Sequence, residues 1–365
     1  MANAPALTFE QIPHPAPVPG ATRDQAIADP GFGTVFTDHM ISIDWDEGKG
    51  WHSAKLCARE PILLDPAASV LHYAQEIFEG MKAYRRDDGT MALFRPDQNA
   101  RRFNDSARRL AMPEMPEDTF IEAVETVVKA DRDWFPSVDG GSLYIRPFMF
   151  ANEHFLGVRP ARKYKFLVIL SPAGNYFKSG APAVSIWVSS DYSRAAPGGT
   201  GAAKCGGNYA ASLVPQAEAI AEGHDQVVFL DAVERKWIEE LGGMNLFFVF
   251  DDGSMITPPL GGTILPGITR DSLLTLAREE GLTVREERYS LEQWRDDATS
   301  GRLVETMACG TAAVVTPVGR VASRDGEFTI GSGGPGQLTT KLRQKLVGIQ
   351  RGTVEDTHGW VRTID

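Results

Sequence analysis

The stretch GGTGAAKCGGNYAASL, residues Gly198 to Leu213, places a single lysine, Lys204, among glycines, alanines and other small residues. On an ordinary protein surface, a lysine covers apolar neighbours with its stem and keeps its ammonium in water. Residues this small leave the stem little to cover, and they let the backbone and the amine approach another molecule closely. An amine that loses its hydration is deprotonated more readily and becomes a nucleophile for carbonyl groups. By itself the stretch also fits a lysine in a glycine-rich surface turn, so other motifs must decide.

A pair of carboxylates lies in the segment WIEELGGMNLFFVF, residues Trp237 to Phe250. Glu239 and Glu240 stand beside a Gly-Gly pair and close to a very apolar run. A carboxylate there is costly to bury unless it faces a cation or a hydrogen-bond donor. A protonated pyridine nitrogen is such a donor.

Two further segments offer donors for a phosphate group. LPGITRDSLL, residues Leu265 to Leu274, begins a helix directly after Pro-Gly, so the amides of Ile268 and Thr269 can bind an anion at the positive end of the helix. ACGTAA, residues Ala308 to Ala313, adds Thr311 as a hydroxyl and amide donor in a turn of small residues. A lysine, a carboxylate and a phosphate seat together predict a site for pyridoxal 5'-phosphate, although each signal is weak alone.

Motifs for other chemistries are missing or sit in the wrong context. The segment GSGGPG, residues Gly331 to Gly336, matches a dinucleotide-binding fingerprint, with Glu355 and Asp356 at a suitable distance. However, no second strand separates the following helix from these acids, so we interpret the segment as a loop that caps the last helix. The sequence holds no zinc-binding histidine spacing, no G-x-S-x-G elbow and no phosphate-binding G-x-x-x-x-G-K-[ST] loop.

Composition favours a globular cytoplasmic protein. The chain has 365 residues, enough for two domains, with 42% hydrophobic and 23% charged residues. Its net charge of −11 argues against a nucleic-acid partner. Three cysteines without a CxxC pattern predict a reducing compartment. The N-terminus does not resemble a secretory signal, and no apolar run approaches the roughly 20 residues of a membrane helix.

Strands and helices alternate irregularly, which favours an α+β class over a doubly wound parallel sheet. Apolar periodicity and flanking signals predict helices over 97–112, 117–130, 269–280 and 337–350. Apolar runs predict strands over 91–94, 142–150, 164–170, 184–189, 226–230 and 245–250, the last forming a hairpin with 255–257. The first thirty residues, rich in proline and alanine, are expected to form an extended arm.

The best linker signal is SPAGNYFKSGAP, residues Ser171 to Pro182, which combines proline, glycine and serine. We predict a smaller N-terminal α/β domain with its arm over 1–178 and an interdomain linker region over 179–197. The larger cofactor-binding domain is predicted over 198–365.

Eight segments together resemble the branched-chain amino acid aminotransferases, in the same order and from about residue 31 to the C-terminus. They are the lysine stretch itself and FTDHM (36–40), LHYAQEIFEGMKAY (71–84), FRPDQNARRF (94–103), SLYIRPFMFANE (142–153), EELGGMN (239–245), TPPLGGTILPGITRDSLL (257–274) and ACGTAAVVTPVG (308–319). The resemblance implies a two-domain, fold type IV pyridoxal-phosphate enzyme, like D-amino acid aminotransferase, that forms a homodimer or a higher homo-oligomer.

The resemblance also implies roles for residues that bind the cofactor. Lys204 matches the catalytic lysine, which forms the internal aldimine and moves a proton between the substrate Cα and the cofactor. Glu240 matches the partner of the pyridine nitrogen, and Tyr209 matches the phenol that bonds the cofactor's O3′. Arg102 matches the phosphate arginine, with its neighbour Arg101 on the solvated face. The remaining phosphate ligands are Ile268, Thr269 and Thr311.

For the substrate, the resemblance implies that the α-carboxylate is held by Thr311, Ala312 and a tyrosine matching Tyr73, lent by the partner subunit. Arg146 matches the arginine that accepts the distal carboxylate of glutamate. A mostly apolar pocket with one arginine suits a site that holds leucine and glutamate in turn. The expected pocket walls, each of which also fits plain core packing, are Phe32, Phe78, Tyr144, Val158 and Tyr176.

The implied reaction transfers the amino group of leucine, isoleucine or valine to 2-oxoglutarate, which gives the branched 2-oxo acid and L-glutamate. The same fold also hosts D-amino acid aminotransferases and aminodeoxychorismate lyases, and a nicotinamide-binding protein built on GSGGPG is a further alternative. Two positions depart from relatives. Ala313 and Thr316 replace the CxxC pair of mammalian members, and Gly243 stands where some relatives have threonine.

Overall fold

The computed structural model describes residues 7–138, 140–174 and 183–364. It divides the chain into two compact units, each of which draws on separate parts of the sequence. The first holds Met1–Tyr176, Ala203–Gly206 and Gln350–Asp365, and the second holds Phe177–Ala202 and Gly207–Ile349. The lysine stretch therefore contributes to both units. The predicted domain boundaries along the chain stay a prediction, and Tyr176 lies outside the described residues.

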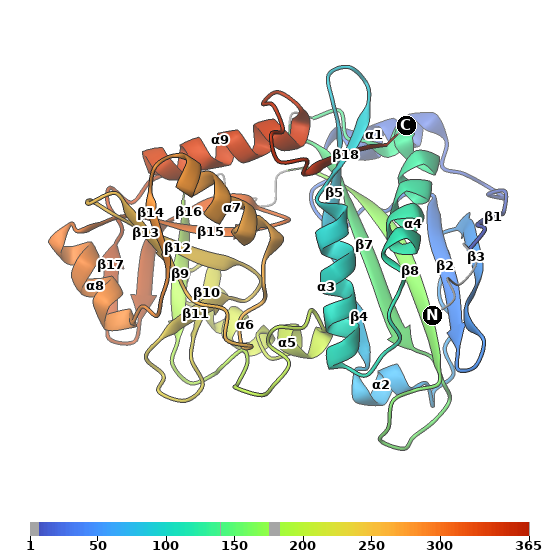
Figure 1. Ribbon diagram of the computed structural model, residues 1–365, viewed down its shortest axis with the longest axis horizontal. Helices are drawn as coiled ribbons and strands as arrows, with labels where there is room; N and C mark the ends of the chain where they lie inside the picture. Colours follow the sequence, from blue (N-terminus) through green and yellow to red (C-terminus); the bar gives the residue numbers. More distant parts are fainter. Residues whose placement is uncertain (1–6, 139, 175–182, 365) are drawn as a thin grey trace. The chain divides into compact units, whose positions relative to one another are not determined.

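The first unit is built on a mostly antiparallel sheet with the strand order β1-β3-β2-β8-β7-β5-β6-β18, and β4 pairs with β7 (Figure 1). Only the β1–β3 pair is parallel among the described strands of this sheet. The strands are β1 (Glu10–Gln11), β2 (His39–Asp46), β3 (Gly50–Ala58), β4 (Glu76–Phe78), β5 (Met81–Arg85), β6 (Met91–Phe94), β7 (Ser142–Ala151), β8 (Lys163–Ala173) and β18 (Val361–Ile364).

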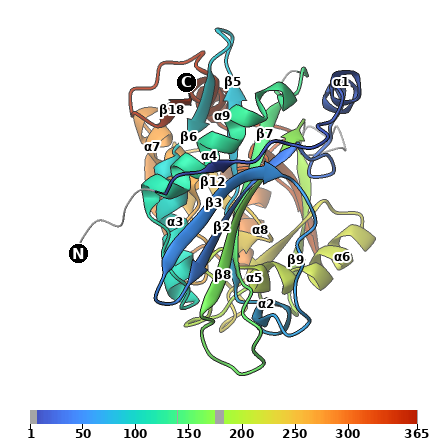
Figure 2. The same ribbon diagram turned by 90° about the vertical axis from the view of Figure 1, so that its right-hand side faces the viewer.

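Helices α3 (Pro96–Arg109) and α4 (Glu117–Ala130) cover one face of this sheet (Figures 1 and 2). Their apolar faces meet at Phe103 and Phe120, whose ring centroids lie 5.6 and 5.9 Å from that of Phe166 on β8. The predicted bounds of α4 are confirmed, whereas α3 ends three residues before the predicted end because Ala111 takes a left-handed φ of 53°. The shorter helices are α1 (Gly20–Ala28), α2 (Ser69–Tyr73) and the 3₁₀ turn Arg132–Trp134.

The expectation of an extended N-terminal arm is wrong for part of that segment. Helix α1 forms over Gly20–Ala28, directly after Pro19. Its sequence GATRDQAIA consists mostly of residues with good helix propensity, and it buries Ile27 in the core of the first unit. Proline and alanine content alone misled the prediction because proline before a first turn is compatible with a helix.

The second unit has a mixed sheet with the order β11-β10-β9-β16-β15-β12-β13-β14, and β17 pairs with β16. Strand β9 is parallel to both β10 and β16, and β13 is parallel to β14. The strands are β9 (Val184–Ser189), β10 (Gln226–Leu230), β11 (Ile238–Leu241), β12 (Asn245–Phe250), β13 (Ser254–Thr257), β14 (Thr283–Glu286), β15 (Leu303–Gly310), β16 (Val314–Ser323) and β17 (Gly326–Thr329).

The helices of the second part of the chain are α5 (Gly206–Ala210), α6 (Leu213–Ala221), α7 (Ile268–Glu279), α8 (Leu291–Ser300) and α9 (Gln337–Arg351). The predicted hairpin is confirmed, since β12 and β13 pair antiparallel across the turn at Asp251–Gly253. Residues 184–189, which fall in the predicted linker region, form β9 inside the sheet. Two mixed sheets with packed helices confirm the predicted α+β class.

Candidate active site

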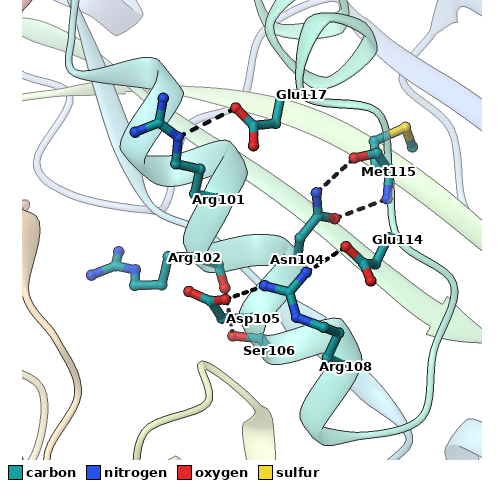
Figure 3. A network of polar contacts seen from close by, with 9 residues as sticks. All are labelled: Arg101, Arg102, Asn104, Asp105, Ser106, Arg108, Glu114, Met115 and Glu117. Atoms are coloured by element: carbon teal, nitrogen blue, oxygen red, sulfur yellow. Dashed lines mark hydrogen bonds and ion pairs between the residues drawn. The ribbon is translucent and has the colours of Figure 1, made fainter.

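The backbone of Lys204 is held by two elements of the first unit. Its N–H donates to Ser106 Oγ on α3 over 2.9 Å, and its carbonyl accepts from the N–H of Phe78 on β4 over 3.0 Å. Ser106 Oγ in turn donates to the Arg102 carbonyl over 3.0 Å, as Figure 3 shows. The Gly206 N–H donates to the Glu76 carboxylate. These bonds explain why residues 203–206 pack with the first unit although the sequence on both sides belongs to the second.

The Lys204 ammonium faces an aromatic surface. Its Nζ lies 4.7 Å from the centre of the Phe78 ring, and the Arg146 guanidinium lies 4.6 Å from the same centre. Arg146 Nη2 also donates to the Tyr144 hydroxyl over 2.9 Å, and the Phe32 ring meets the Tyr144 ring edge-on at 5.0 Å. The structure thus brings four predicted substrate residues together beside the lysine. We call Phe32, Phe78, Tyr144 and Arg146 the aromatic–arginine cluster.

Gly80 makes room for this cluster. A Cβ at residue 80 would lie less than 3.0 Å from the Tyr144 hydroxyl oxygen and 3.2 Å from its Cζ. Only glycine therefore lets the tyrosine hydroxyl approach the backbone this closely. The Glu-Gly pair at 79–80 is a feature whose meaning the sequence did not reveal.

Arg102 and Arg101 point in different directions from α3 (Figure 3). Arg101 is exposed and lies 3.4 Å from Glu117, which confirms its expected place on the solvated face. Arg102 is buried, and its Nε and Nη2 each donate to the Glu79 carboxylate over 2.8 Å. The Asn99 amide donates to the same carboxylate over 2.7 Å. Sequence reasoning missed Glu79 and Asn99 because nothing local marks them as partners of Arg102.

Glu79 has no exposed surface, yet it is held as a carboxylate. Burial by itself raises its pKa. The guanidinium of Arg102, the ammonium of Lys204 and the Asn99 amide outweigh burial, so the pKa of Glu79 lies below its usual value. Glu79 therefore keeps a negative charge beside Arg102.

Tyr73 and Val158 are exposed side chains in this chain. Tyr73 ends α2, is 40% exposed, and donates its hydroxyl to the Leu156 carbonyl. Val158 is 88% exposed, so within this chain it lines no buried wall. Their predicted roles in the substrate pocket stay predictions, and that of Tyr73 requires a second subunit.

In the second unit, Glu240 on β11 is buried more deeply than its neighbour Glu239, with 2% of its surface exposed. Its Oε1 accepts from the Leu265 N–H over 2.9 Å and pairs with Arg194 Nη1 at 2.7 Å. Arg194 is itself buried and also donates to the Thr263 carbonyl over 3.2 Å. The adjacent Glu239 instead accepts from the Thr263 hydroxyl over 2.6 Å, and burial raises the pKa of Glu239. Arg194 is a site residue that sequence reasoning missed.

The predicted phosphate seat at α7 lies next to the Glu240 network. Asn245 donates to the Leu265 carbonyl over 3.1 Å, and its Oδ1 occupies the place that a Cβ on Gly267 would take. Gly267 is the N-cap of α7 and has no side chain with which to cap the helix. The first amides of α7, those of Ile268 and Thr269, therefore meet the helix-dipole condition for binding an anion.

The turn at Thr311 and Ala312 connects β15 with β16 in the same region. A Cβ on Gly310 would lie 3.3 Å from Met244 Cγ and 3.4 Å from the Gly243 carbonyl oxygen, so this turn packs against the start of β12. Val314, which follows the turn, has a φ of 62°. A β-branched residue with a left-handed backbone is a strained feature of the kind that clusters at functional sites.

Gly243 also lies beside Tyr209, which belongs to α5. A Cβ at residue 243 would be 3.8 Å from Tyr209 Cε1, an ordinary van der Waals distance. The position could therefore hold a small side chain against the tyrosine ring, and glycine leaves that contact open.

The start of α9, directly after the glycine-rich segment 331–336, binds a carboxylate of the chain itself. Glu305 accepts from the N–H groups of Leu338 and Thr339 over 2.9 and 2.8 Å and from the Thr339 hydroxyl over 2.7 Å. A Cβ on Gly336 would overlap the Glu305 side chain. The segment does precede α9 as a loop, but the group that caps the helix is the Glu305 side chain on β15. This helix N-terminus is therefore already occupied by an internal anion, which removes the basis for a dinucleotide site.

The donor groups found in the two units fit pyridoxal 5'-phosphate. They comprise an amine, a buried carboxylate suited to a pyridinium nitrogen, and a helix start with a glycine N-cap suited to a phosphate. The fold and these groups define a pyridoxal-phosphate enzyme of fold type IV.

Comparison with known proteins agrees. Residues 76–321 match the family model of amino-transferase class IV. The branched-chain-amino-acid aminotransferase of Mycolicibacterium smegmatis is 54% identical over 367 residues and covers 100% of both chains. The solved branched-chain amino acid aminotransferase of Escherichia coli has a TM-score of 0.74 and 32% identity, and covers 88% of this chain and 99% of its own.

A further branched-chain amino acid aminotransferase, from the organism abbreviated T.th., has been solved with N-(5'-phosphopyridoxyl)-L-glutamate and with 4-methylvaleric acid. Each structure matches with a TM-score of 0.72 and 28% identity, over 88% of this chain and 98% of that chain. This chain therefore belongs to the branched-chain amino acid aminotransferases of class IV. Its cofactor is pyridoxal 5'-phosphate, as the sequence predicted. No helix of the described residues has the length and apolar character needed to cross a membrane.

Proposed function

We propose that this enzyme transfers the amino group of L-leucine, L-isoleucine or L-valine to 2-oxoglutarate, which gives the branched 2-oxo acid and L-glutamate. The names of the relatives support the branched-chain class. The T.th. enzyme was solved with a glutamate derivative and with a branched acid, which supports one acidic and one branched substrate for the proposed reaction. Within this chain, the observation that carries the proposal is the aromatic–arginine cluster.

The cluster can serve an apolar and an acidic side chain in turn. Arg146 lies against the rings of Phe78 and Tyr144, which stabilise a guanidinium without water through cation–π contacts. Its Nε is buried and finds no acceptor among the described residues. The rings offer an apolar wall to a leucine side chain, and the guanidinium offers donors to the distal carboxylate of glutamate. Val158 and Tyr176 complete the pocket in this proposal.

When bound, pyridoxal 5'-phosphate supplies an electron sink that stabilises a carbanion at the substrate Cα. Lys204 holds the cofactor through Nζ and moves the proton at the substrate Cα. Glu240, kept in place by Arg194 and the Leu265 amide, partners the pyridine nitrogen. Tyr209 donates to the cofactor's O3′.

The anionic groups of cofactor and substrate have separate ligands in this proposal. Arg102 binds the phosphate through charge-assisted bonds, for which a guanidinium is well suited. The amides of Ile268 and Thr269 and the hydroxyl of Thr311 complete that seat. The Thr311 and Ala312 amides, together with Tyr73 of the partner subunit, hold the α-carboxylate.

The proposed homodimer accounts for an apolar surface on the first unit. Leu71, Leu156 and Val158 are 58%, 62% and 88% exposed, and the Tyr73 hydroxyl bonds to Leu156 among them. Exposed apolar side chains of this kind mark a contact surface. We also propose a cytoplasmic location, for which the absence of a disulfide pattern in the sequence is the support. Sedimentation of the native enzyme should give a dimer or a multiple of it, and a monomer at micromolar concentration would contradict the role of Tyr73.

The decisive experiment is the visible spectrum of the purified enzyme before and after L-leucine is added without an oxo acid. The yellow band of the bound cofactor should bleach, and the Lys204→Ala variant should show neither the native band nor turnover. A band that responds to D-alanine and ignores L-leucine would move the function to the D-amino acid group. A protein that stays colourless with added pyridoxal 5'-phosphate would refute the site.

A further inference from the structure

The carboxylate of Glu79 accepts hydrogen bonds from Arg102, the proposed phosphate arginine, and from two neighbouring groups. Its Oε1 accepts from Arg102 Nε, and its Oε2 accepts from Arg102 Nη2, Asn99 Nδ2 and the Gly80 N–H over 2.8, 2.7 and 3.2 Å. Two parallel bonds to one guanidinium fix the plane of that group as well as its position. A side chain that is otherwise long and flexible is thereby given one orientation.

Burial makes this arrangement necessary for Arg102. The side chain of Arg102 is 8% exposed and that of Glu79 is not exposed at all. A buried guanidinium without a counter-ion is costly, so without Glu79 the arginine would turn toward water. The pair therefore keeps a cation inside the protein when no phosphate is present.

Lys204 lies close enough to help keep this carboxylate ionised. The Phe78 N–H bonds to the Lys204 carbonyl, which places residue 79 directly after the contact with the lysine segment. Lys204 and Arg102 both stabilise the ionised form of Glu79 electrostatically. Both charges keep Glu79 ionised, and the two hydrogen bonds from Arg102 fix how that anion meets the guanidinium.

We propose that Glu79 is a positioning residue, which holds the Arg102 guanidinium in the orientation that binds the cofactor's phosphate. The proposal rests on the proposed function, because it takes Arg102 as the phosphate ligand. An anion that instead competed with the phosphate for Arg102 would weaken cofactor binding. The two ideas differ in sign, so a binding measurement separates them.

The test compares two ligands that differ only in the phosphate group. The full-length protein, stripped of cofactor, is titrated with pyridoxal 5'-phosphate and with pyridoxal, and binding is followed by absorbance. Glu79→Gln should weaken binding of pyridoxal 5'-phosphate by about tenfold or more and change binding of pyridoxal by less than about twofold. Glu79→Asp, which keeps the charge, should bind pyridoxal 5'-phosphate more tightly than Glu79→Gln does and less tightly than the wild type does. Glu117→Gln, which removes the exposed carboxylate partner of the neighbouring Arg101, is the matched control and should change neither affinity.

Arg102→Met separates a failure of this proposal from a failure of the proposed function. If Arg102→Met leaves the preference for the phosphorylated ligand intact, the assignment of Arg102 is wrong. If Arg102→Met abolishes the preference while Glu79→Gln preserves or strengthens it, only the role of Glu79 is overturned. Equal losses for both ligands in Glu79→Gln would likewise overturn it, because they indicate a general structural role.

The double variant Glu79→Gln/Arg102→Met covers the case in which Glu79→Gln does not fold. It removes both buried charges, so it should fold if the unpaired Arg102 charge is what prevents Glu79→Gln from folding. Its affinity for pyridoxal 5'-phosphate should then equal that of Arg102→Met alone, because Glu79 acts only through the arginine. A further loss in the double variant would contradict the proposal.

Discussion

Substitution of Gly80 by alanine should change which substrate the enzyme prefers. The new Cβ would lie less than 3.0 Å from the Tyr144 hydroxyl oxygen, whereas ordinary contact begins at 3.4 Å. The hydroxyl must therefore retreat, and it is the atom that accepts from Arg146 Nη2 over 2.9 Å. The substitution thus removes a hydrogen bond of Arg146, whose guanidinium is proposed to bind the distal carboxylate. It alters no group that contacts the cofactor in our proposal.

The size of the effect follows from the bond that is lost. A hydrogen bond to a charged group is worth about 1.5–3 kcal/mol. Since about 1.4 kcal/mol corresponds to a factor of ten, Gly80→Ala should lower kcat/KM for L-glutamate about 10- to 100-fold. A leucine side chain makes no use of the guanidinium donors, so kcat/KM for L-leucine should fall by much less.

L-Glutamate and L-leucine both react with the pyridoxal-phosphate form of the enzyme. Bleaching of the cofactor band in a single turnover therefore measures kcat/KM for each amino acid directly. Gly261→Ala is the control, because a Cβ at residue 261 meets no atom within 4 Å. In a Tyr144→Phe background, which has no hydroxyl to displace, Gly80→Ala should have little further effect. Equal losses for glutamate and leucine would refute the reasoning, because they would indicate a distorted backbone instead of a displaced hydroxyl.

Three further predictions concern stability and are checked by urea denaturation. Arg194→Met leaves the Glu240 carboxylate buried without its cation, so it should lower the free energy of unfolding by about 3–5 kcal/mol, and adding Glu240→Gln should recover most of that loss. The bond to Asp131 at 2.6 Å raises the pKa of His39, so the wild type should lose more stability than His39→Gln as the pH rises from 6 to 8. Burial raises the pKa of Asp231, but four backbone N–H bonds outweigh it and lower that pKa to about 2. The wild type should therefore lose more stability than Asp231→Asn as the pH falls from 5 to 2, and equal acid sensitivity would contradict this.

Local pattern was sufficient for most of the secondary structure. The bounds of α4 follow from its apolar periodicity, and the strands β9, β10 and β12 follow from continuous apolar runs. The helix α1 was missed because proline and alanine content does not distinguish an extended arm from a short helix that starts after a proline.

Several partners in the site could not be inferred from local pattern. Glu79 lies 23 positions before Arg102, and Glu305 lies 33 positions before the amide of Leu338 that it caps. Gly80 and Tyr144, and Arg194 and Glu240, are likewise brought together only by the fold. A single sequence contains no periodicity that links such positions, since their proximity depends on how distant strands and helices pack.

The sequence by itself determined the chemistry, because the residue types that bind pyridoxal 5'-phosphate must be an amine, a carboxylate and phosphate donors. The lysine stretch, the Glu240 segment and the start of α7 each carry one of these in a recognisable local form. Only the tertiary structure decided the partners that tune them. Bonds from Phe78, Ser106 and Glu76 place Lys204 with the first unit, and a buried charge such as Arg102 or Glu240 requires a counter-ion that the folded chain alone can supply.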